Sequence, residues 1–188
     1  MRLDKLVPED LDPEQREVYE AIAGGDRAEG EQLFPLVDSD GSLTGPFGAM
    51  LHAPRIGGPL QALGSAIRFR TSLSDRVREI AILQVGRALG SEFEWWAHER
   101  VARSVGVTSE EITAISLGSF TGRDDRERLS YEVVANLLES EVVAEEEFAR
   151  ASAVLSEQEL VELSVLVGYY RTLAQTMTLF GIGLPDHE

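Results

Sequence analysis

The sequence predicts an all-α fold on two observations: signals for helix starts and stops recur along the whole chain, and signals for strands are missing. Four segments carry a capping motif, in which the residue before a helix and the residue three positions on can satisfy each other's backbone amides. They are Asp12–Gln15, Ser91–Glu94, Thr108–Glu111 and Ser156–Glu159. No stretch alternates apolar and polar residues over the length of a half-buried strand, and no tight hairpin turn joins two strand-like runs. Helices alone can therefore account for the fold.

Length and charge predict a globular protein that binds neither nucleic acids nor membranes. The 188 residues are typical of one domain, and 33 acidic against 17 basic residues give a formal net charge of -16. Phosphate backbones and anionic bilayers would repel such a chain. The apolar stretch 160–184 is interrupted by charged and amide residues, so we interpret it as a buried helix. Residues 1–5 carry no apolar leader, and we expect a cytoplasmic protein.

The chain contains no cysteine. This excludes disulfides, thiolate metal sites, iron–sulfur clusters and every thiol-based redox mechanism. Its three histidines, His52, His98 and His187, are too few for a histidine-rich metal site, and we expect no metal.

Residues 1–44 are predicted as an N-terminal helix followed by an acidic arm, and residues 45–188 as the main helical domain. The first helix begins after Asp12, with proline at its first position, and ends near Gly24. Residues 26–44 are acidic, polar and glycine-containing, which predicts a loop. Within it, residues 38–41 resemble part of a calcium loop, but apolar residues stand at the first and last ligand positions. We interpret them as a turn.

The centre of the fold is predicted to be an antiparallel hairpin of two helices, residues 73–90 and 91–106, that meet at Gly90. Ser74 caps the first helix, which is apolar on nearly every side and is therefore expected to be buried. Further helices are predicted around residues 47–51, 59–69, 108–118, 124–138, 144–154 and 155–180. Pro54 and the Gly57-Gly58 pair are expected to separate the first two of these.

A weak internal repeat relates residues 73–87 to residues 155–168. Each segment begins with Leu-Ser and an acidic residue and continues into a helix that contains a glutamate among apolar residues and, later, a glycine. The spacing differs by one residue between the two copies. We expect two similar capped helices that pack as a pair, with Leu155–Phe180 against the central hairpin. Coincidence between two amphipathic helices is the alternative.

The candidate chemistry centres on His98. Ser91, Glu94 and His98 have the spacing i, i+3, i+7, so they share one helix face, with Trp95 beside them. Glu79 lies in the otherwise apolar preceding helix, where a carboxylate needs a partner or a cavity. In an antiparallel hairpin it falls opposite His98. One imidazole and two carboxylates within reach make a proton-transfer site that needs no cofactor.

Structural roles compete with this hypothesis at each position. Ser91 and Glu94 can act only as a capping box, and Glu94 and His98 can form a surface pair. Glu79 can neutralise Arg87 or Arg78, and Arg87 can alternatively bind a substrate carboxylate. Trp95 is typical of a core or an interface. A metal held by Glu94 and His98 lacks further histidine ligands.

The sequence resembles the carboxymuconolactone decarboxylase family, which is related to alkylhydroperoxidase D. The resemblance covers residues 45–180 and is carried by Arg78–Leu83, Glu92–Trp95 and His98, and also by Gly45–Phe47, Leu51–Pro54 and Glu162–Gly168. Relatives in the alkylhydroperoxidase branch have a Glu, a Cys-x-x-Cys twelve residues on, and a His four residues after the second Cys. Here the spacing is kept from Glu79 to His98, but Ser91 and Glu94 replace the cysteines.

This replacement disfavours a thiol-dependent peroxidase, because a hydroxyl and a carboxylate cannot attack a peroxide and then form a disulfide. Resemblance to the cysteine-free branch implies instead a cofactor-independent enzyme for a small carboxylated lactone or carbonyl substrate. It would be a decarboxylase-like carbon–carbon lyase or a related lactone-processing enzyme. His98 is then the general acid/base, Glu79 its orienting partner, and Glu94 a second acid/base or a positioning group.

We also predict that Ser91, Trp95, Arg87 and His52 line the substrate pocket. The resemblance implies that the chain forms a homo-oligomer, a trimer or hexamer, with a dimer as the alternative. Lactone hydrolysis and isomerisation need the same proton-transfer groups as decarboxylation, so both remain alternatives. A non-catalytic oligomeric helical protein, with His98 in a structural pair, is the alternative outside enzymes.

Overall fold

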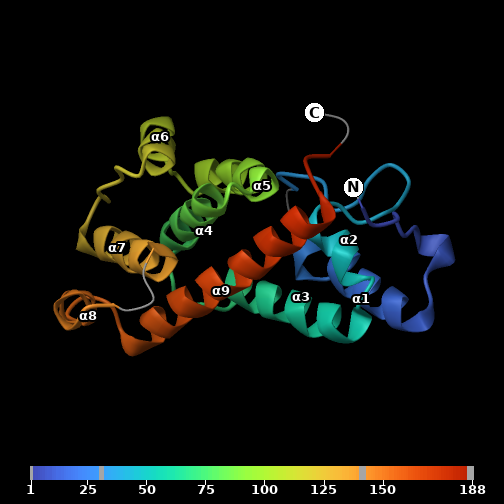
Figure 1. The fold of residues 1–188 in the computed structure, drawn as a ribbon, viewed down its shortest axis with the longest axis horizontal. Coiled ribbons are helices and arrows are strands. Elements are labelled where there is room, and N and C mark those ends of the chain that lie inside the picture. Colours follow the sequence, from blue (N-terminus) through green and yellow to red (C-terminus); the bar gives the residue numbers. More distant parts are fainter. Residues whose placement is uncertain (1, 30–31, 140–142, 186–188) are drawn as a thin grey trace. The chain divides into compact units, whose positions relative to one another are not determined.

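The computed structural model describes residues 2–29, 32–139 and 143–185, and His187 lies outside this part of the chain. The described residues form helices, turns and one isolated backbone bridge between Val37 and Leu43, which confirms the all-α fold class (Figure 1). The α-helices are α1 Pro13–Ala23, α2 Pro46–Met50, α3 Pro54–Phe69, α4 Asp75–Leu89, α5 Glu92–Ser104, α6 Ser109–Leu117, α7 Asp125–Glu139, α8 Glu145–Ser152 and α9 Glu157–Phe180. Among the helices described, none is both long and apolar enough to cross a membrane.

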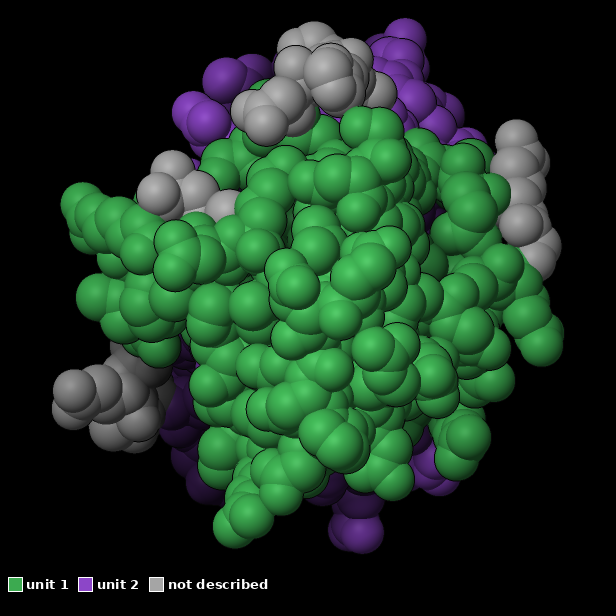
Figure 2. Space-filling view, turned by 90° about the vertical axis from the view of Figure 1, so that its right-hand side faces the viewer, with its two compact units in different colours: residues 1–70, 173–188 green, residues 71–172 purple. Residues whose placement is uncertain are grey.

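The chain divides into two compact units, coloured separately in Figure 2. Unit 1 contains residues 1–70 and 173–188, and unit 2 contains residues 71–172. Helix α9 begins in unit 2 and ends in unit 1. The predicted division of the chain into an N-terminal part, residues 1–44, and a main helical domain, residues 45–188, stays a prediction.

In unit 1, helices α1 and α2 both pack against α3. The capping box at Asp12 and Gln15 is present as predicted. Helix α3 differs from the prediction, because it begins at Pro54 and continues through Gly57, Gly58 and Pro59 without a break. Gly57 allows a close approach rather than a stop: a Cβ atom there would lie 2.2 Å from the carbonyl oxygen of Met50.

The segment between α1 and α2, predicted as an acidic loop, packs apolar side chains into unit 1. Phe34, Leu36 and Leu43 are buried in it. The predicted turn at residues 38–41 is confirmed, since the Gly41 amide donates to the Asp38 carbonyl at 3.0 Å.

Unit 2 contains the predicted antiparallel hairpin of α4 and α5. Gly90 ends α4 in the left-handed conformation, with φ of 60°, and the Ser91 amide donates back to the Gly86 carbonyl at 2.9 Å. Close packing follows along the pair, because a Cβ atom on Gly86 would lie 3.5 Å from the Cβ atom of Glu94. The hairpin therefore packs the last turn of α4 against the first turn of α5.

Apolar side chains from α4, α5 and α6 form a core cluster in unit 2. Its buried members are Ile80, Leu83, Ala102, Val107, Ile112, Ile115 and Phe120. The capping boxes at Thr108 and Ser156 are present as predicted and begin α6 and α9.

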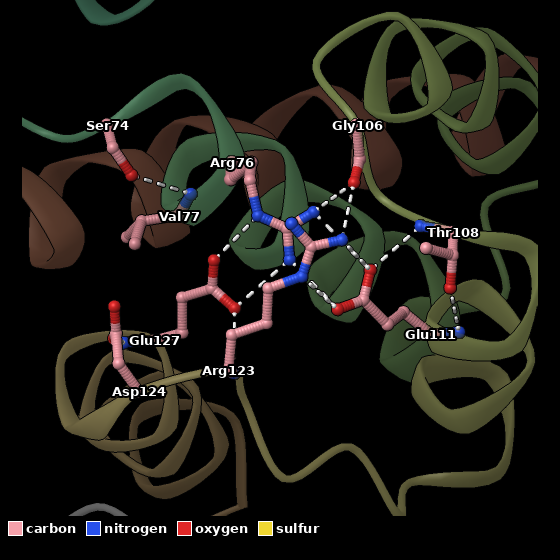
Figure 3. A network of polar contacts seen from close by, with 9 residues as sticks. All are labelled: Ser74, Arg76, Val77, Gly106, Thr108, Glu111, Arg123, Asp124 and Glu127. Atoms are coloured by element: carbon pink, nitrogen blue, oxygen red, sulfur yellow. Dashed lines mark hydrogen bonds and ion pairs between the residues drawn. The ribbon is translucent and has the colours of Figure 1, made fainter.

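Two arginines and two glutamates hold α4, α6 and α7 together at the edge of this core (Figure 3). The guanidinium of Arg76 binds both oxygens of Glu127 through Nε and Nη2, at 2.7 and 3.1 Å, and Nη2 also contacts Glu111 at 3.0 Å. Arg123 binds the same Glu111 at 2.9 Å, and both arginines donate to the Gly106 carbonyl. The hydrogen bonds to Glu127, the largest influence, raise the pKa of Arg76.

We expect Arg76→Gln to lower the free energy of unfolding by about 2–3 kcal/mol, because it leaves two largely buried carboxylates without their common cation. The side chains of Arg76 and Glu127 are only 15% and 8% exposed. Urea unfolding at pH 7 measures the change. Arg55→Gln is the matched control, since it breaks the exposed pair with Glu14 and should leave stability unchanged. Equal losses in both variants would contradict the assigned role of the network.

Candidate functional site

The hairpin of unit 2 brings His98 and Glu79 into direct contact. Nδ1 of His98 lies 2.7 Å from Oε2 of Glu79, and both residues are buried, Glu79 to 1% exposure. A carboxylate oxygen accepts, so Nδ1 carries the hydrogen and donates it. Nε2 is then the ring nitrogen that this hydrogen bond does not use. The predicted position of Glu79 opposite His98 agrees with this geometry.

Two further residues fix this pair. Nε of Arg78 lies 3.3 Å from the other oxygen of Glu79, while its Nη1 contacts Asp75 at 2.9 Å. The charge of Glu79 is thus balanced inside the helix that carries it. Tyr170 of α9 meets the imidazole of His98 edge to face, with ring centroids 5.2 Å apart and planes at 89°. Contacts on both sides restrict the rotation of the imidazole.

Glu94 lies one helical turn before His98 and does not act as a helix cap. Ser91 is the N-cap residue of α5 but makes no side-chain capping hydrogen bond, and its amide is taken by the Gly86 carbonyl. The predicted capping box at Ser91 and Glu94 is therefore wrong. The tight turn at Gly90 directs the Ser91 amide back to α4, where the Glu94 carboxyl cannot reach it.

The Glu94 carboxyl is instead buried without a partner. It is 2% exposed, and neither oxygen has a hydrogen-bond partner in the described part of the chain. Burial raises the pKa of Glu94 to about 8, and the nearby Ser91 hydroxyl opposes this shift only in part. At neutral pH the group is mostly a neutral carboxylic acid that can donate a proton. The site thus combines a potential acid with an oriented imidazole.

The other predicted site residues lie in different surroundings. Trp95 is half-buried and packs against the apolar core cluster of unit 2. Arg87 is exposed, with its guanidinium beside Gly118, and Arg78 rather than Arg87 pairs with Glu79. His52 belongs to unit 1, where its Nε2 lies 3.1 Å from the Asp4 carbonyl. That Trp95, Arg87 and His52 bind a substrate remains a prediction.

Sequence reasoning missed Tyr170 entirely and treated Arg78 only as one of two neutralising candidates. Tyr170 lies 72 positions from His98, and no local pattern indicates that their rings meet. Arg78 is adjacent to Glu79, and its burial follows from the way α4 packs. Within the residues that the structure describes, no group of three or more histidine, aspartate and glutamate side chains is arranged to hold a metal ion.

Comparison with known proteins gives a family match and several similar structures. Residues 54–136 match the model of the Carboxymuconolactone decarboxylase family, a range that contains Glu79, Glu94 and His98. A comparison with curated proteins gives no match.

The similar structures have low sequence identity and show a shared fold. The alkylhydroperoxidase AhpD core of an uncharacterized peroxidase-related protein from Ralstonia eutropha JMP134 has a TM-score of 0.76 and 12% identity, covering 98% of this chain and 92% of that one. The debrominase Bmp8, in a Cys-to-Ala variant bound to 2,3,4-tribromopyrrole, has a TM-score of 0.74 and 13% identity, covering 99% and 92%.

An AhpD-related protein of unknown function from Agrobacterium tumefaciens has a TM-score of 0.66 and 19% identity, covering 74% of this chain and 97% of that one. The match over residues 54–136 contains the hairpin and its Glu79–His98 contact, and the fold is that of the AhpD-like proteins. Residues 54–136 therefore match the carboxymuconolactone decarboxylase family, and the chain shares its fold with AhpD-like proteins.

Proposed function

We propose that this protein is an enzyme that needs no cofactor and transfers protons on a small carboxylated lactone or carbonyl substrate. One observation carries the proposal: the buried Glu94 carboxyl lies one helical turn from the Glu79-bound imidazole of His98 and has no hydrogen-bond partner among the described residues. A polar group buried in this way lowers stability. Residues with strongly displaced pKa values are concentrated at functional sites.

The three side chains have separable roles in this proposal. His98 is the general acid/base and acts through Nε2, because Nδ1 donates to Glu79. Glu79 orients the imidazole and favours one tautomer. Glu94, in its neutral form, donates a hydrogen bond or a proton to the substrate oxygen on which negative charge develops.

Decarboxylation illustrates the balance of the reaction. The bond between a lactone carbon and its carboxylate breaks, carbon dioxide leaves, and the bonding electron pair moves through the conjugated ring toward the carbonyl oxygen. Glu94 stabilises that oxygen, and protonated His98 gives a proton to the carbon. The net change is one substrate carboxylate and one proton converted to product and carbon dioxide. Lactone hydrolysis and isomerisation are the nearest alternatives, since they use the same groups.

A thiol-dependent peroxidase activity is not expected, because the chain has no cysteine. Purified protein should turn over a hydroperoxide with a dithiol reductant no faster than a heat-inactivated sample. Consumption of peroxide above that control would contradict the expected chemistry.

The direct test of the proposal uses 4-carboxymuconolactone as the probe, with released carbon dioxide as the readout. The expected result is turnover that chelators leave unchanged and that His98→Gln removes. Turnover that is lost on chelation and restored by one metal would instead support metal ligation by Glu94 and His98. No turnover of this probe, or of simpler lactones by ring opening or isomerisation, would overturn the proposal and favour a non-catalytic role.

A further inference from the structure

A buried arginine in unit 1 has two hydrogen-bond donors that no other described residue uses. Arg27 lies in a short 3-10 helix after α1, Asp26–Ala28, and its side chain is buried, with the residue only 7% exposed. Its Nε and Nη2 atoms are buried, and neither has a hydrogen-bond partner in the part of the chain that the structure describes. Arg78, buried to a similar degree, pairs with Glu79. A buried cation without an anion lowers stability, so Arg27 lacks a partner that its burial calls for.

The two unused atoms form the edge by which other arginines of this chain bind carboxylates. In the covalent fork of a guanidinium, Nε–H and one Nη–H point the same way and match the two oxygens of a carboxylate. Several ion pairs of the described chain use Nε and Nη2 for both oxygens of one glutamate: Arg76 with Glu127 at 2.7 and 3.1 Å, Arg55 with Glu14 at 3.2 and 2.8 Å, and Arg123 with Glu111 at 2.9 and 3.2 Å. In Arg27 the same edge has no acceptor.

The side chains around Arg27 hold the guanidinium but do not neutralise it. Its Cζ atom lies over the ring of Phe47, 5.1 Å from the ring centroid, a contact that leaves the edge of the guanidinium unoccupied. The adjacent Asp26 is exposed and is held elsewhere, since one oxygen accepts from the Ser65 hydroxyl at 3.4 Å and lies 4.0 Å from Nη2 of Arg70. The chain has 33 acidic residues, so the missing anion does not reflect a shortage of carboxylates.

We propose that Arg27 binds the carboxylate of a small molecule, with Nε–H and Nη2–H each donating to one oxygen. A carboxylate uses both of its oxygens on this edge, as the glutamate pairs do, whereas a phosphate has further oxygens that need donors. The aromatic contact with Phe47 favours the charged guanidinium and restricts its motion. Because the edge is enclosed, the ligand has few atoms, and neighbouring side chains move when it enters.

The direct test follows the Nε–H resonance of Arg27 in the full-length protein by NMR during titration with sodium formate. Inorganic phosphate and chloride are the other probes, at a constant ionic strength of about 0.15 M, which screens the overall negative charge of the protein. We expect a saturable shift with formate, binding of phosphate weaker by about tenfold or more, and no shift with chloride. A resonance that responds to none of the probes would show that the edge holds water only, and equal responses to all three would show a general salt effect. Either result would overturn the proposal.

The same resonance separates a small ligand from a second copy of the protein. Without formate, the Nε–H signal of Arg27 should not depend on protein concentration. A shift that appears on concentrating the protein would show that a neighbouring molecule supplies the carboxylate, and would contradict a small-molecule site.

Variants test the fork and the charge apart, with the formate-induced rise in the midpoint of thermal unfolding as the readout. Arg27→Lys keeps a positive charge but has no fork, so formate should bind about tenfold more weakly or worse. Arg27→Met should show no rise with formate, and without formate it should be at least as stable as the wild type, because no unpaired cation is buried. Persistence of the rise in Arg27→Met would rule out the site. If that variant does not fold, the NMR titration of the wild type still decides.

Arg68→Met is the matched control. Arg68 also lies in unit 1 and over a phenylalanine ring, 5.4 Å from the centroid of Phe69, but that ring is 45% exposed. The variant loses the same charge and the same kind of contact, and it should keep the full response to formate. An equal loss in Arg68→Met would show that the response reflects net charge alone and would refute the role of Arg27. Since the readouts are binding and stability in unit 1, either outcome is independent of the proposed lactone chemistry.

Discussion

His98→Gln is expected to lower the turnover of a carboxylated lactone by about 10²–10⁴, the usual contribution of a general acid or base. The glutamine has no titratable nitrogen, so it cannot exchange a proton with the substrate through the position of Nε2. Glu79→Gln should also lower turnover, because the amide replaces the ionised acceptor that holds Nδ1 at 2.7 Å. Single-turnover measurements with 4-carboxymuconolactone would give both effects.

Glu162→Gln is the matched control for the glutamate variant. Glu162 occupies the corresponding helix of the repeat, but its carboxylate accepts from the amide and hydroxyl of Ser72 at 2.9 and 2.8 Å. The same chemical change there should leave turnover unaltered. If Glu79→Gln and His98→Gln both kept full activity, the catalytic site would have to lie elsewhere.

Glu94→Gln is expected to make the protein more stable than the wild type at neutral pH. The pKa of Glu94 is about 8 in the folded protein, against 4.5 for an ordinary glutamate, because of burial. Between these values the folded state keeps a proton that the unfolded state releases, so wild-type stability falls as pH rises. The loss approaches about 1.4 kcal/mol per pH unit. A glutamine at this position does not titrate, and Glu94 makes no contribution to capping, because the Ser91 amide donates to the Gly86 carbonyl instead.

Urea unfolding of the two proteins at pH 5, 6, 7 and 8 checks this expectation. The stability of Glu94→Gln relative to the wild type should increase steadily over this range and level off above pH 8. Glu162→Gln should differ from the wild type by a nearly constant amount over this range, because contacts with Gln158 and Ser72 outweigh burial and lower the pKa of Glu162. That variant should be less stable than the wild type at pH 7, and the difference should shrink as pH falls below 4.5. A constant difference for Glu94→Gln would contradict its burial as a neutral acid.

The sequence was sufficient to predict features that local chemistry determines. The capping boxes at Asp12, Thr108 and Ser156, the helix end at Gly90 and the hairpin that sets Glu79 opposite His98 depend on residues close together in the chain. Helix period and antiparallel geometry then place the two side chains on facing surfaces.

Features that depend on packing were not predictable from the same signals. Gly57 and Gly58 looked like a helix break, but α3 continues because its backbone packs closely on Met50. Ser91 and Glu94 had the spacing of a capping box, yet the amide of Ser91 turns back to α4. This contact with the preceding helix is what leaves Glu94 without a capping role. The contact of Tyr170 with His98 joins distant helices and has no counterpart in local sequence.

The network of Arg76, Arg123, Glu111 and Glu127 has a consequence for how unit 2 opens. Helix α6 has nine residues, too few for a stable helix in isolation. Its Glu111 is bound by Arg76 of α4 and by Arg123, which leads into α7, so α6 cannot detach without releasing both cations. Amide hydrogens in α6 and in the first turns of α7 should therefore exchange with solvent through one shared opening, at the same free energy. In Arg76→Gln this shared free energy should fall, while the contact of Arg123 with Glu111 still joins the two segments.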